Sequence, residues 1–221
     1  MSRARRPSPT TPQLDFTPPH TIAATDPESL DRGDSRDGEC FADLDLSERD
    51  LSHTTFDGCE FNSVTLSSAE LRGTRLRHTL MADSFALQLS AHRSTWRDVL
   101  VRNPRWGLAE VYEAELIGVH ILQGKINYLN LRNSKLTDVL IEDCGIDELD
   151  LSGSRARRLW LKNCRIGTLT LAGTDCINVD LRTSQYTTIN GFDGLRGTTI
   201  DDIQLTLLAP LLAAHLGITV E

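Results

Sequence analysis

The sequence contains few aromatic residues, no closely spaced cysteines and no long apolar run. Aromatic residues make up 5% of its 221 residues, which is low for a compact core built from large rings. Its five cysteines lack the CxxC spacing of zinc and redox sites. The odd cysteine count, together with a charged N-terminus that no apolar stretch follows, predicts a protein of the reducing cytoplasm.

The chain also lacks an excess of positive charge. Lys and Arg number 23 against 31 Asp and Glu, which gives a formal net charge of −8. Because binding to phosphates needs clustered cationic side chains, this balance argues against nucleic acid as a direct partner. The apolar stretch near the C-terminus is short and contains Gln204, Pro210 and His215, which argues against a membrane span.

Residues 1–38 differ in composition from the rest of the chain. They hold most of the eight prolines, with Ser, Thr and mixed charges, and too few apolar residues to be buried. We therefore expect a disordered N-terminal tail. Its Arg-rich start, residues 3–6, is interpreted as a solvated leader, with contact to an acidic surface as the alternative.

A five-residue period begins at Phe41. Every fifth residue from Phe41 to Tyr186 is nonpolar, without interruption. This period matches neither an α-helix, at about 3.6 residues, nor a flat strand, at about two. It predicts a coiled chain in which each side is one five-residue unit and the central residue points at the axis. Such a unit buries its apolar residue only by stacking on the next coil, as in other solenoids.

The residue two positions before each centre indicates the number of sides. From 119 to 189 it alternates between large branched residues (Val119, Leu129, Val139, Leu149, Leu159, Leu169, Val179 and Ile189) and small ones (Gly124, Ser134, Cys144, Ser154, Cys164, Thr174 and Ser184). This alternation persists down stacked coils only if each coil has an even number of sides. We therefore expect four sides, with the large residues on two opposite sides, in about seven coils.

The repeats resemble those of a known family. Units such as 69–73 (AELRG), 149–153 (LDLSG) and 179–183 (VDLRT) are similar to the consensus A(D/N)LXX of pentapeptide-repeat proteins. The resemblance implies an all-β fold, a right-handed quadrilateral parallel β-helix, which we expect over residues 39–198. It also implies a non-enzymatic protein-interaction scaffold, whose partner the repeats do not name.

A second function follows from the same resemblance. Several bacterial pentapeptide-repeat proteins resemble a DNA duplex in size, shape and negative charge. They bind DNA gyrase or topoisomerase IV and protect it from quinolones or peptide toxins. A DNA-mimicking binder of such a topoisomerase is therefore the alternative to a scaffold with another protein partner.

No group of side chains predicts a catalytic site, a cofactor or a metal centre. On a four-sided coil the histidines fall on different faces or outside it, except His53 and His92, which lie about two coils apart without an acidic partner in register. Cys144 and Cys164 are one coil apart and are predicted to stack as small buried thiols, with a disulfide as the alternative. We therefore expect no enzyme activity.

Charge is divided unevenly among the predicted sides. One side has an acidic excess, and there we expect a partner-binding face that includes Asp43, Glu60, Asp83, Glu142 and Asp143. The neighbouring side has a basic excess, with Arg155, Arg157 and Arg158 in one unit. This basic stripe departs from the acidity of the DNA-mimicking members.

The period breaks at Gly191, and we expect residues 199–221 to form a C-terminal cap. A helix is predicted from Ile200 to Leu216, capped by Thr198 or Thr199. Its leucine face should cover the open end of the last coil: Ile203, Leu207, Leu208, Leu211, Leu212 and Leu216. Similar pentapeptide-repeat proteins dimerise through their C-terminal ends. We therefore expect a homodimer in which the small side of the helix, with Ala209 and Ala213, meets a second copy.

Two features break the pattern between residues 81 and 110. Trp106 falls one coil after Ala86, so an oversized and an undersized residue are expected to compensate in volume. Pro104 takes one of the flanking inward positions. Because proline has no N–H, we expect the hydrogen-bond ladder to be disrupted between Arg102 and Gly107.

Overall fold

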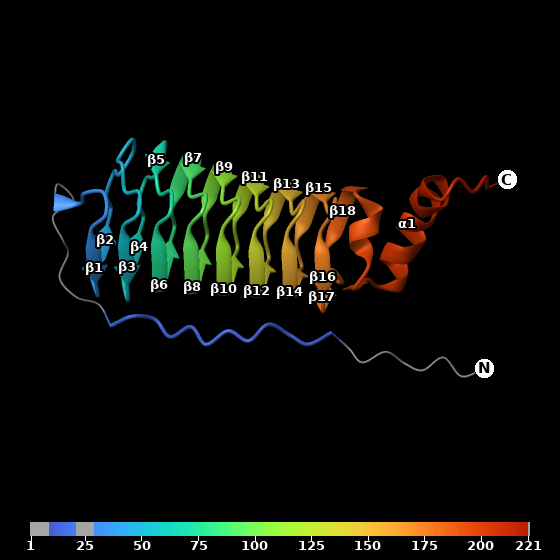
Figure 1. Cartoon of the computed structure of the whole chain (residues 1–221), viewed down its shortest axis with the longest axis horizontal. Coiled ribbons are helices and arrows are strands. Elements are labelled where there is room, and N and C mark those ends of the chain that lie inside the picture. The colour runs from blue at the N-terminus through green and yellow to red at the C-terminus, as the bar shows by residue number, and fades with distance from the viewer. Residues whose placement is uncertain (1–8, 21–28, 221) are drawn as a thin grey trace.

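The computed structural model describes residues 9–20 and 29–220, which form a stack of parallel coils with a helix at the C-terminal end (Figure 1). One sheet contains β1 (Ser35–Asp37), β2 (Cys40–Ala42), β3 (Thr55–Asp57), β4 (Glu60–Asn62), β6 (Arg75–Ala82), β8 (Thr95–Arg102), β10 (Glu115–Leu122), β12 (Lys135–Glu142), β14 (Arg155–Lys162), β16 (Asp175–Ile177), β17 (Val179–Asp180) and β19 (Thr198–Thr199). The other contains β5 (Ala69–Glu70), β7 (Phe85–Ser90), β9 (Arg105–Glu110), β11 (Lys125–Asn130), β13 (Gly145–Asp150), β15 (Arg165–Thr170) and β18 (Gln185–Asn190). The helices are the 3-10 helix η2 (Phe192–Leu195) and α1 (Asp202–His215).

Strand pairing has a constant offset of one coil. Leu116 of β10 pairs with Leu136 of β12, and Ile126 of β11 pairs with Ile146 of β13, always in parallel. This offset of 20 residues is four units of five, whereas a three-sided coil requires an offset of about 15. The predicted four-sided, all-β solenoid is therefore confirmed, with about eight turns.

The five-residue period marks the core. Its residues are buried from Phe41 to Leu181, and only Tyr186, the last of them, is half-buried. Trp106 lies directly over Ala86 in the β7–β9 pair, as predicted. The indole N–H of Trp106 donates to Ser84 Oγ at 3.1 Å, so this large ring is accommodated with its polar atom satisfied.

The stack begins upstream of the expected boundary at residue 39. β1 pairs with β3, and Leu30 is already buried in the core. Residues 9–20 belong to the segment expected to be disordered, and they lie extended alongside the coils (Figure 1). The Arg-rich start, residues 3–6, lies outside the described residues.

Pro104 does not disrupt the ladder, contrary to the prediction. The N–H of Arg105 donates to the preceding coil at 2.9 Å, and the carbonyl of Pro104 accepts from Lys125 N at 2.8 Å. The prediction was wrong because Pro104 lies at the corner between β8 and β9. A residue at this corner does not donate its backbone N–H to the ladder, so proline removes no ladder bond there. One coil later the corresponding N–H, that of Gly124, points to the Sγ of Cys144 at 3.2 Å.

The constant offset ends at the last coil. Val179 pairs with Thr198, one residue short of a full coil. The two threonines of β19 are still strand residues, so neither caps the helix as predicted. The N-cap is Asp201, whose Oδ1 accepts from Gln204 N at 2.8 Å.

Candidate functional site at the C-terminal end

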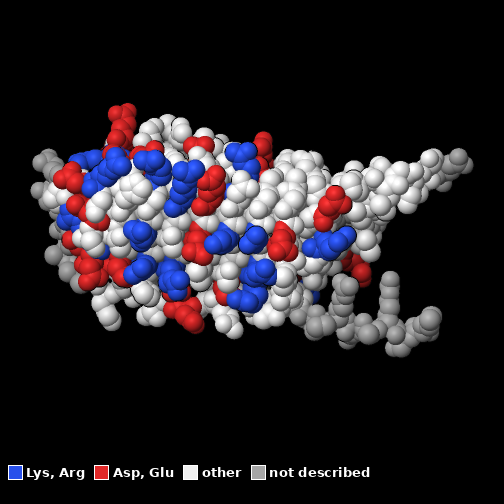
Figure 2. All heavy atoms as spheres, in the orientation of Figure 1, with Lys and Arg blue, Asp and Glu red and all other residues white. Residues whose placement is uncertain are grey.

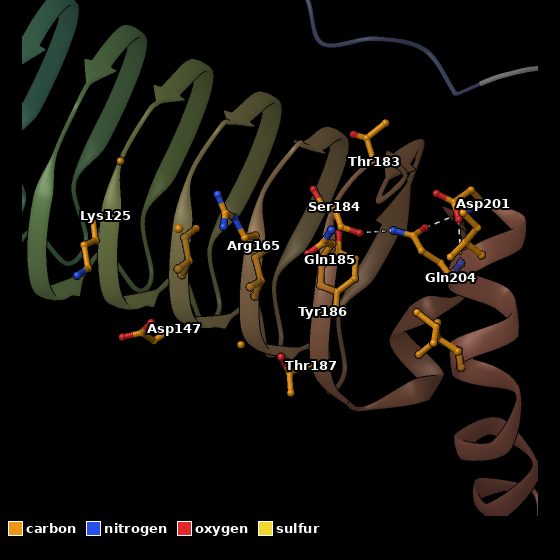
Figure 3. A pocket seen from close by; sticks show the side chains of 18 residues that line it. Lys125, Asp147, Arg165, Thr183, Ser184, Gln185, Tyr186, Thr187, Asp201 and Gln204 are labelled. Carbon is orange, nitrogen blue, oxygen red and sulfur yellow. Dashed lines mark hydrogen bonds between the residues drawn. The ribbon is translucent and has the colours of Figure 1, made fainter.

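One polar side chain, that of Gln204, fixes α1 to the last coil (Figure 3). Its Nε2 donates to the main-chain oxygens of Leu181 at 2.6 Å and Ser184 at 2.7 Å. Its Oε1 accepts from Asp201 N at 3.0 Å, which completes a capping box. Because no further coil follows, the Ser184 carbonyl would otherwise be buried without a donor, whereas the Leu181 carbonyl also accepts from the Tyr186 hydroxyl at 3.1 Å. Gln204 is absent from the predicted site residues, although the spacing Asp201-x-x-Gln204 is the signal of such a box.

The edge of α1 that faces the coil is narrow. Leu208 is buried and Leu212 packs against the same core, so these two residues do cover the last coil. Ile203, Leu207 and Leu211 do not, since 73%, 68% and 44% of their surfaces are exposed. The prediction of a single docked leucine face is therefore wrong, because a polar side chain determines which edge of the helix meets the coil.

The exposed residues form a continuous apolar row. Ile203, Leu207 and Leu211 are four residues apart and so lie on one side of α1. We call this row the α1 stripe. Ala209 is exposed elsewhere on the helix, and Ala213 is half-buried. The stripe exposes three large apolar side chains, whereas the side with Ala209 exposes two, those of Leu205 and Leu216.

The α1 stripe borders a groove of about 1090 Å³ (Figure 3). The other side of the groove comes from β11, β13, β15 and β18 and includes Ile146, Ile166 and Tyr186. Gly145 contributes no side chain there, and the space that its Cβ would enter is open. Lys125, Asp147 and Arg165 add charges of both signs. An apolar surface with a few charged groups is typical of a protein or peptide contact.

The acidic residues predicted to bind a partner lie in two settings. Asp43, Asp83 and Asp143 occupy one corner of the coil, with φ of 55°, 54° and 53°. Asp and Asn tolerate this left-handed conformation better than most residues, so the backbone itself favours them there. Asp83 accepts from Asn103 Nδ2 at 2.6 Å, and Asp143 accepts from Asn163 Nδ2 at 3.3 Å.

The other two acidic residues lie on the adjacent flat side, several coils apart. Glu60 accepts from Asn62 Nδ2 at 3.2 Å. Glu142 accepts from Lys162 Nζ at 2.5 Å and lies 3.1 Å from His120 Nε2. The hydrogen bond from Lys162 is the main reason that the pKa of Glu142 is lowered. The five carboxylates therefore follow a corner and a side, and do not converge on one compact site.

Basic residues on the neighbouring side are also paired. Arg158 makes two hydrogen bonds to Asp138, at 2.5 and 2.6 Å, and Arg157 approaches Asp175 at 3.6 Å. Figure 2 shows Lys and Arg interleaved with Asp and Glu on the face in view, and an almost uncharged surface at the helical end. Residues 203–220 contain no Asp, Glu, Lys or Arg.

Reactive side chains are dispersed in the described part of the chain. Among residues 9–20 and 29–220, no group of three or more His, Cys, Asp and Glu is placed to hold a metal ion. Cys144 and Cys164 are free, buried thiols. None of the helices in these ranges has the length and apolar character needed to cross a membrane.

The fold and its repeats define the class of protein, a pentapeptide-repeat β-helix. The family described as pentapeptide repeats matches residues 40–81, with eight copies of the repeat, and the same period continues to Tyr186. The resemblance seen in the sequence is therefore confirmed.

The solved structures to which the chain is similar include QnrB1 and HetL. A trypsin-treated form of QnrB1, a plasmid-mediated fluoroquinolone resistance protein, is 18% identical, with 86% of this chain and 92% of that chain covered and a TM-score of 0.46. HetL, a pentapeptide-repeat protein involved in heterocyst differentiation regulation from Nostoc sp. strain PCC 7120, is 13% identical, with 77% and 91% covered and a TM-score of 0.32. Identities this low concern the fold alone. No curated protein matches the sequence.

Proposed function

We propose that this protein is a non-enzymatic, cytoplasmic scaffold for protein–protein interaction that works as a homodimer joined through α1. The α1 stripe is the observation that carries the proposal. Ile203, Leu207 and Leu211 expose large apolar side chains together, and such patches mark contact sites. The stripe continues into the apolar groove beside it, so a second copy of α1 has a surface on which to bury its own stripe. The flat sides of the coils then remain available for another protein.

Light scattering over a range of concentrations tests the dimer. We expect the mass of two chains for the wild type and of one chain for Leu207→Asp, because a carboxylate in an apolar contact loses its hydration. Ala209→Asp introduces the same charge on the opposite side of α1 and should leave the dimer intact. If Ala209→Asp breaks the dimer instead, the small side is the interface. A wild type that stays monomeric at high micromolar concentration contradicts the dimer.

Capture from a host lysate tests the scaffold. Wild-type protein and the Leu207→Asp variant are used as parallel baits, with an unrelated solenoid as the control. A partner retained by both baits binds the sides of the coils, and one retained only by the wild type requires the dimer or the stripe. No partner above the control with either bait contradicts the scaffold.

A second candidate function is a DNA-mimicking binder of DNA gyrase or topoisomerase IV. The row of Asp43, Asp83 and Asp143 along one corner and the net charge of −8 favour it. The ion pairs of Glu142 and Arg158 count against it, because they divide the charge into neutral pairs. A gyrase supercoiling assay decides between the two functions. Inhibition, or protection from a quinolone, that is lost when the three aspartates are changed to Asn supports mimicry, and no effect at tens of micromolar excludes it.

A further inference from the structure

The N-terminal segment 9–20 runs along the outside of the coils (Figure 1). The N–H of Gln13 donates to Asp138 Oδ1 at 2.9 Å, across 125 residues of sequence. Residues 9–12 lie next to Trp160 and Arg182, with which they line a small cavity. Since Trp160 belongs to a later coil than Asp138, the segment runs from the last coils toward the first.

Burial alternates along this segment. Pro12, Leu14 and Phe16 are half-buried, and the residues between them are exposed. A period of two is that of an extended chain with one side against a surface. Three side chains of the segment therefore face the coils at regular intervals, although no strand pairing holds the segment there.

The coils present a matching apolar row on the outside of β6, β8, β12 and β14. We call it the outer stripe, and it consists of Leu80, Leu100, Leu140 and Trp160. These residues stack one coil apart, with His120 between the second and the third. Leu140 is only 9% exposed, although its strand neighbours Val139 and Ile141 are the ones that point inward. Leu140 lies between His120 and Trp160 of the neighbouring coils, and Gln13 of the N-terminal segment is bound two residues away, at Asp138.

One polar group in the outer stripe is left without a partner. The indole Nε1 of Trp160 is buried and has no hydrogen-bond acceptor among the described residues. A buried donor without an acceptor is destabilising, because it has given up its hydrogen bond to water. Trp160 lines a cavity with residues 9–12, and none of their oxygens accepts from its indole N–H. A different extended peptide with a carbonyl at this point would gain a hydrogen bond that the chain's own segment does not make.

We propose that the outer stripe is a binding site for an extended peptide of a partner protein, with apolar residues at alternate positions, and that residues 9–20 occupy it in the free protein as an autoinhibitory strap. The proposal extends the scaffold function and is independent of the dimer. A strap on the same chain competes at an effective concentration in the millimolar range. A partner peptide therefore binds only if it makes more contacts than the strap, and the free N–H of Trp160 is one such contact.

Fluorescence anisotropy with a labelled synthetic peptide of residues 9–20 tests the proposal on the full chain. Wild-type protein should bind this peptide weakly, because its own strap fills the site. In the double variant Leu14→Asp/Phe16→Asp the strap loses its apolar contacts, and the peptide should bind at least about tenfold more tightly. The matched control Thr11→Asp/Thr17→Asp places the same charges on the exposed side of the strap and should bind as weakly as the wild type.

A third substitution locates the site. Adding Leu140→Asp to the Leu14→Asp/Phe16→Asp chain should abolish peptide binding, while circular dichroism and the melting temperature confirm that the coils persist. If that variant loses the fold, Leu140→Ser replaces it. The proposal is overturned if Leu14→Asp/Phe16→Asp binds the peptide no more tightly than the wild type does, or if the control Thr11→Asp/Thr17→Asp binds it as tightly as that variant. It is also overturned if peptide binding persists after the substitution of Leu140. Light scattering on the same samples reports the dimer separately, so failure of the strap and failure of the dimer are distinguished.

Discussion

The side-chain Nε2 of Gln204 lies 2.6 Å from the main-chain oxygen of Leu181, which precedes it by 23 residues. The same spacing recurs one coil earlier, where Ser184 Oγ donates to the oxygen of Leu161 at 2.7 Å. It recurs again where Cys164 Sγ approaches the oxygen of Ile141 at 3.3 Å. Gln204 therefore takes the position that the next coil would supply, although it belongs to a helix. Its second bond, to Ser184 O, replaces the backbone donor of that missing coil.

Gln204→Leu should destabilise the C-terminal end. The Ser184 carbonyl loses its donor, the Leu181 carbonyl keeps only the Tyr186 hydroxyl, and the capping box is broken, so we expect the free energy of unfolding to fall by about 1–3 kcal/mol. Urea denaturation measures the change, and hydrogen exchange should show faster exchange in β17 and β18 than in β8 and β10. Thr206→Ala, on an exposed position of the same helix, is the control and should change stability by less than about 0.5 kcal/mol. Equal stability of Gln204→Leu and the wild type would contradict the role of this side chain.

Pro104 and Gly124 lie at the same position of successive coils, and the large ring of the first is matched by the absence of a side chain in the second. A Cβ on Gly124 would lie 2.8 Å from Pro104 Cγ and 3.4 Å from Cys144 Sγ. Gly124→Ser alone should therefore cost about 1–3 kcal/mol by overpacking. Pro104→Ser removes the ring that the new side chain would meet. It also introduces the residue type found one coil earlier, at Ser84. The double variant should therefore recover part of the lost stability. A double-mutant cycle by chemical denaturation measures this coupling, and strictly additive effects would refute the match.

The pairing of Glu142 predicts a pH dependence of stability. Its pKa in the folded protein is lowered from 4.5, first of all by the hydrogen bond from Lys162. A lowered carboxyl pKa stabilises the fold above the unfolded pKa, and this stabilisation is lost as pH falls through the folded pKa. Glu142→Gln should therefore be less stable than the wild type near neutral pH, and the difference should shrink below about pH 4.5. Urea melts over a pH series measure it. Glu148→Gln, at an exposed position of β13, is the control and should change the free energy of unfolding near neutral pH by less than about 0.5 kcal/mol.

The coils could be predicted from the sequence because each side repeats a local rule. A nonpolar centre every five residues and the alternation from Val119 to Ile189 determine which residues face inward and how many sides there are. Pro104 misled this reasoning, since the repeat gives the inward positions but not which of them are corners without a ladder donor. Cys144, Cys164 and Ser184 are spaced by one coil of 20 residues, and Gln204 follows at the same interval. The sequence therefore contained a signal for the position of Gln204 on the last coil.

The orientation of α1 and the strap could not be predicted in this way. Leucines surround much of the helix, so their pattern does not select an edge, and the choice depends on where Gln204 reaches the carbonyls of the last coil. The contact between Gln13 and Asp138 joins residues of different segments that no repeat relates. Likewise, the acidic residues could be assigned to sides, but whether Glu142 is free or paired depends on the length and direction of the Lys162 side chain.

Adjacent leucines on α1 provide a test of how the helix docks. Leu208 is 7% exposed and packs on the last coil, whereas Leu207 is 68% exposed. Aspartate has the same low helix propensity at both positions, so a difference between the two variants reports on packing. Leu208→Asp places a carboxylate against the core and should lower the free energy of unfolding by about 3 kcal/mol or more. Leu207→Asp should lower it by no more than the loss of helix propensity, about 0.7 kcal/mol, when both are measured at concentrations low enough to keep the chains monomeric. Thermal unfolding followed by circular dichroism measures both, and equal losses would mean that the helix does not meet the coil through the edge of Gln204, Leu208 and Leu212.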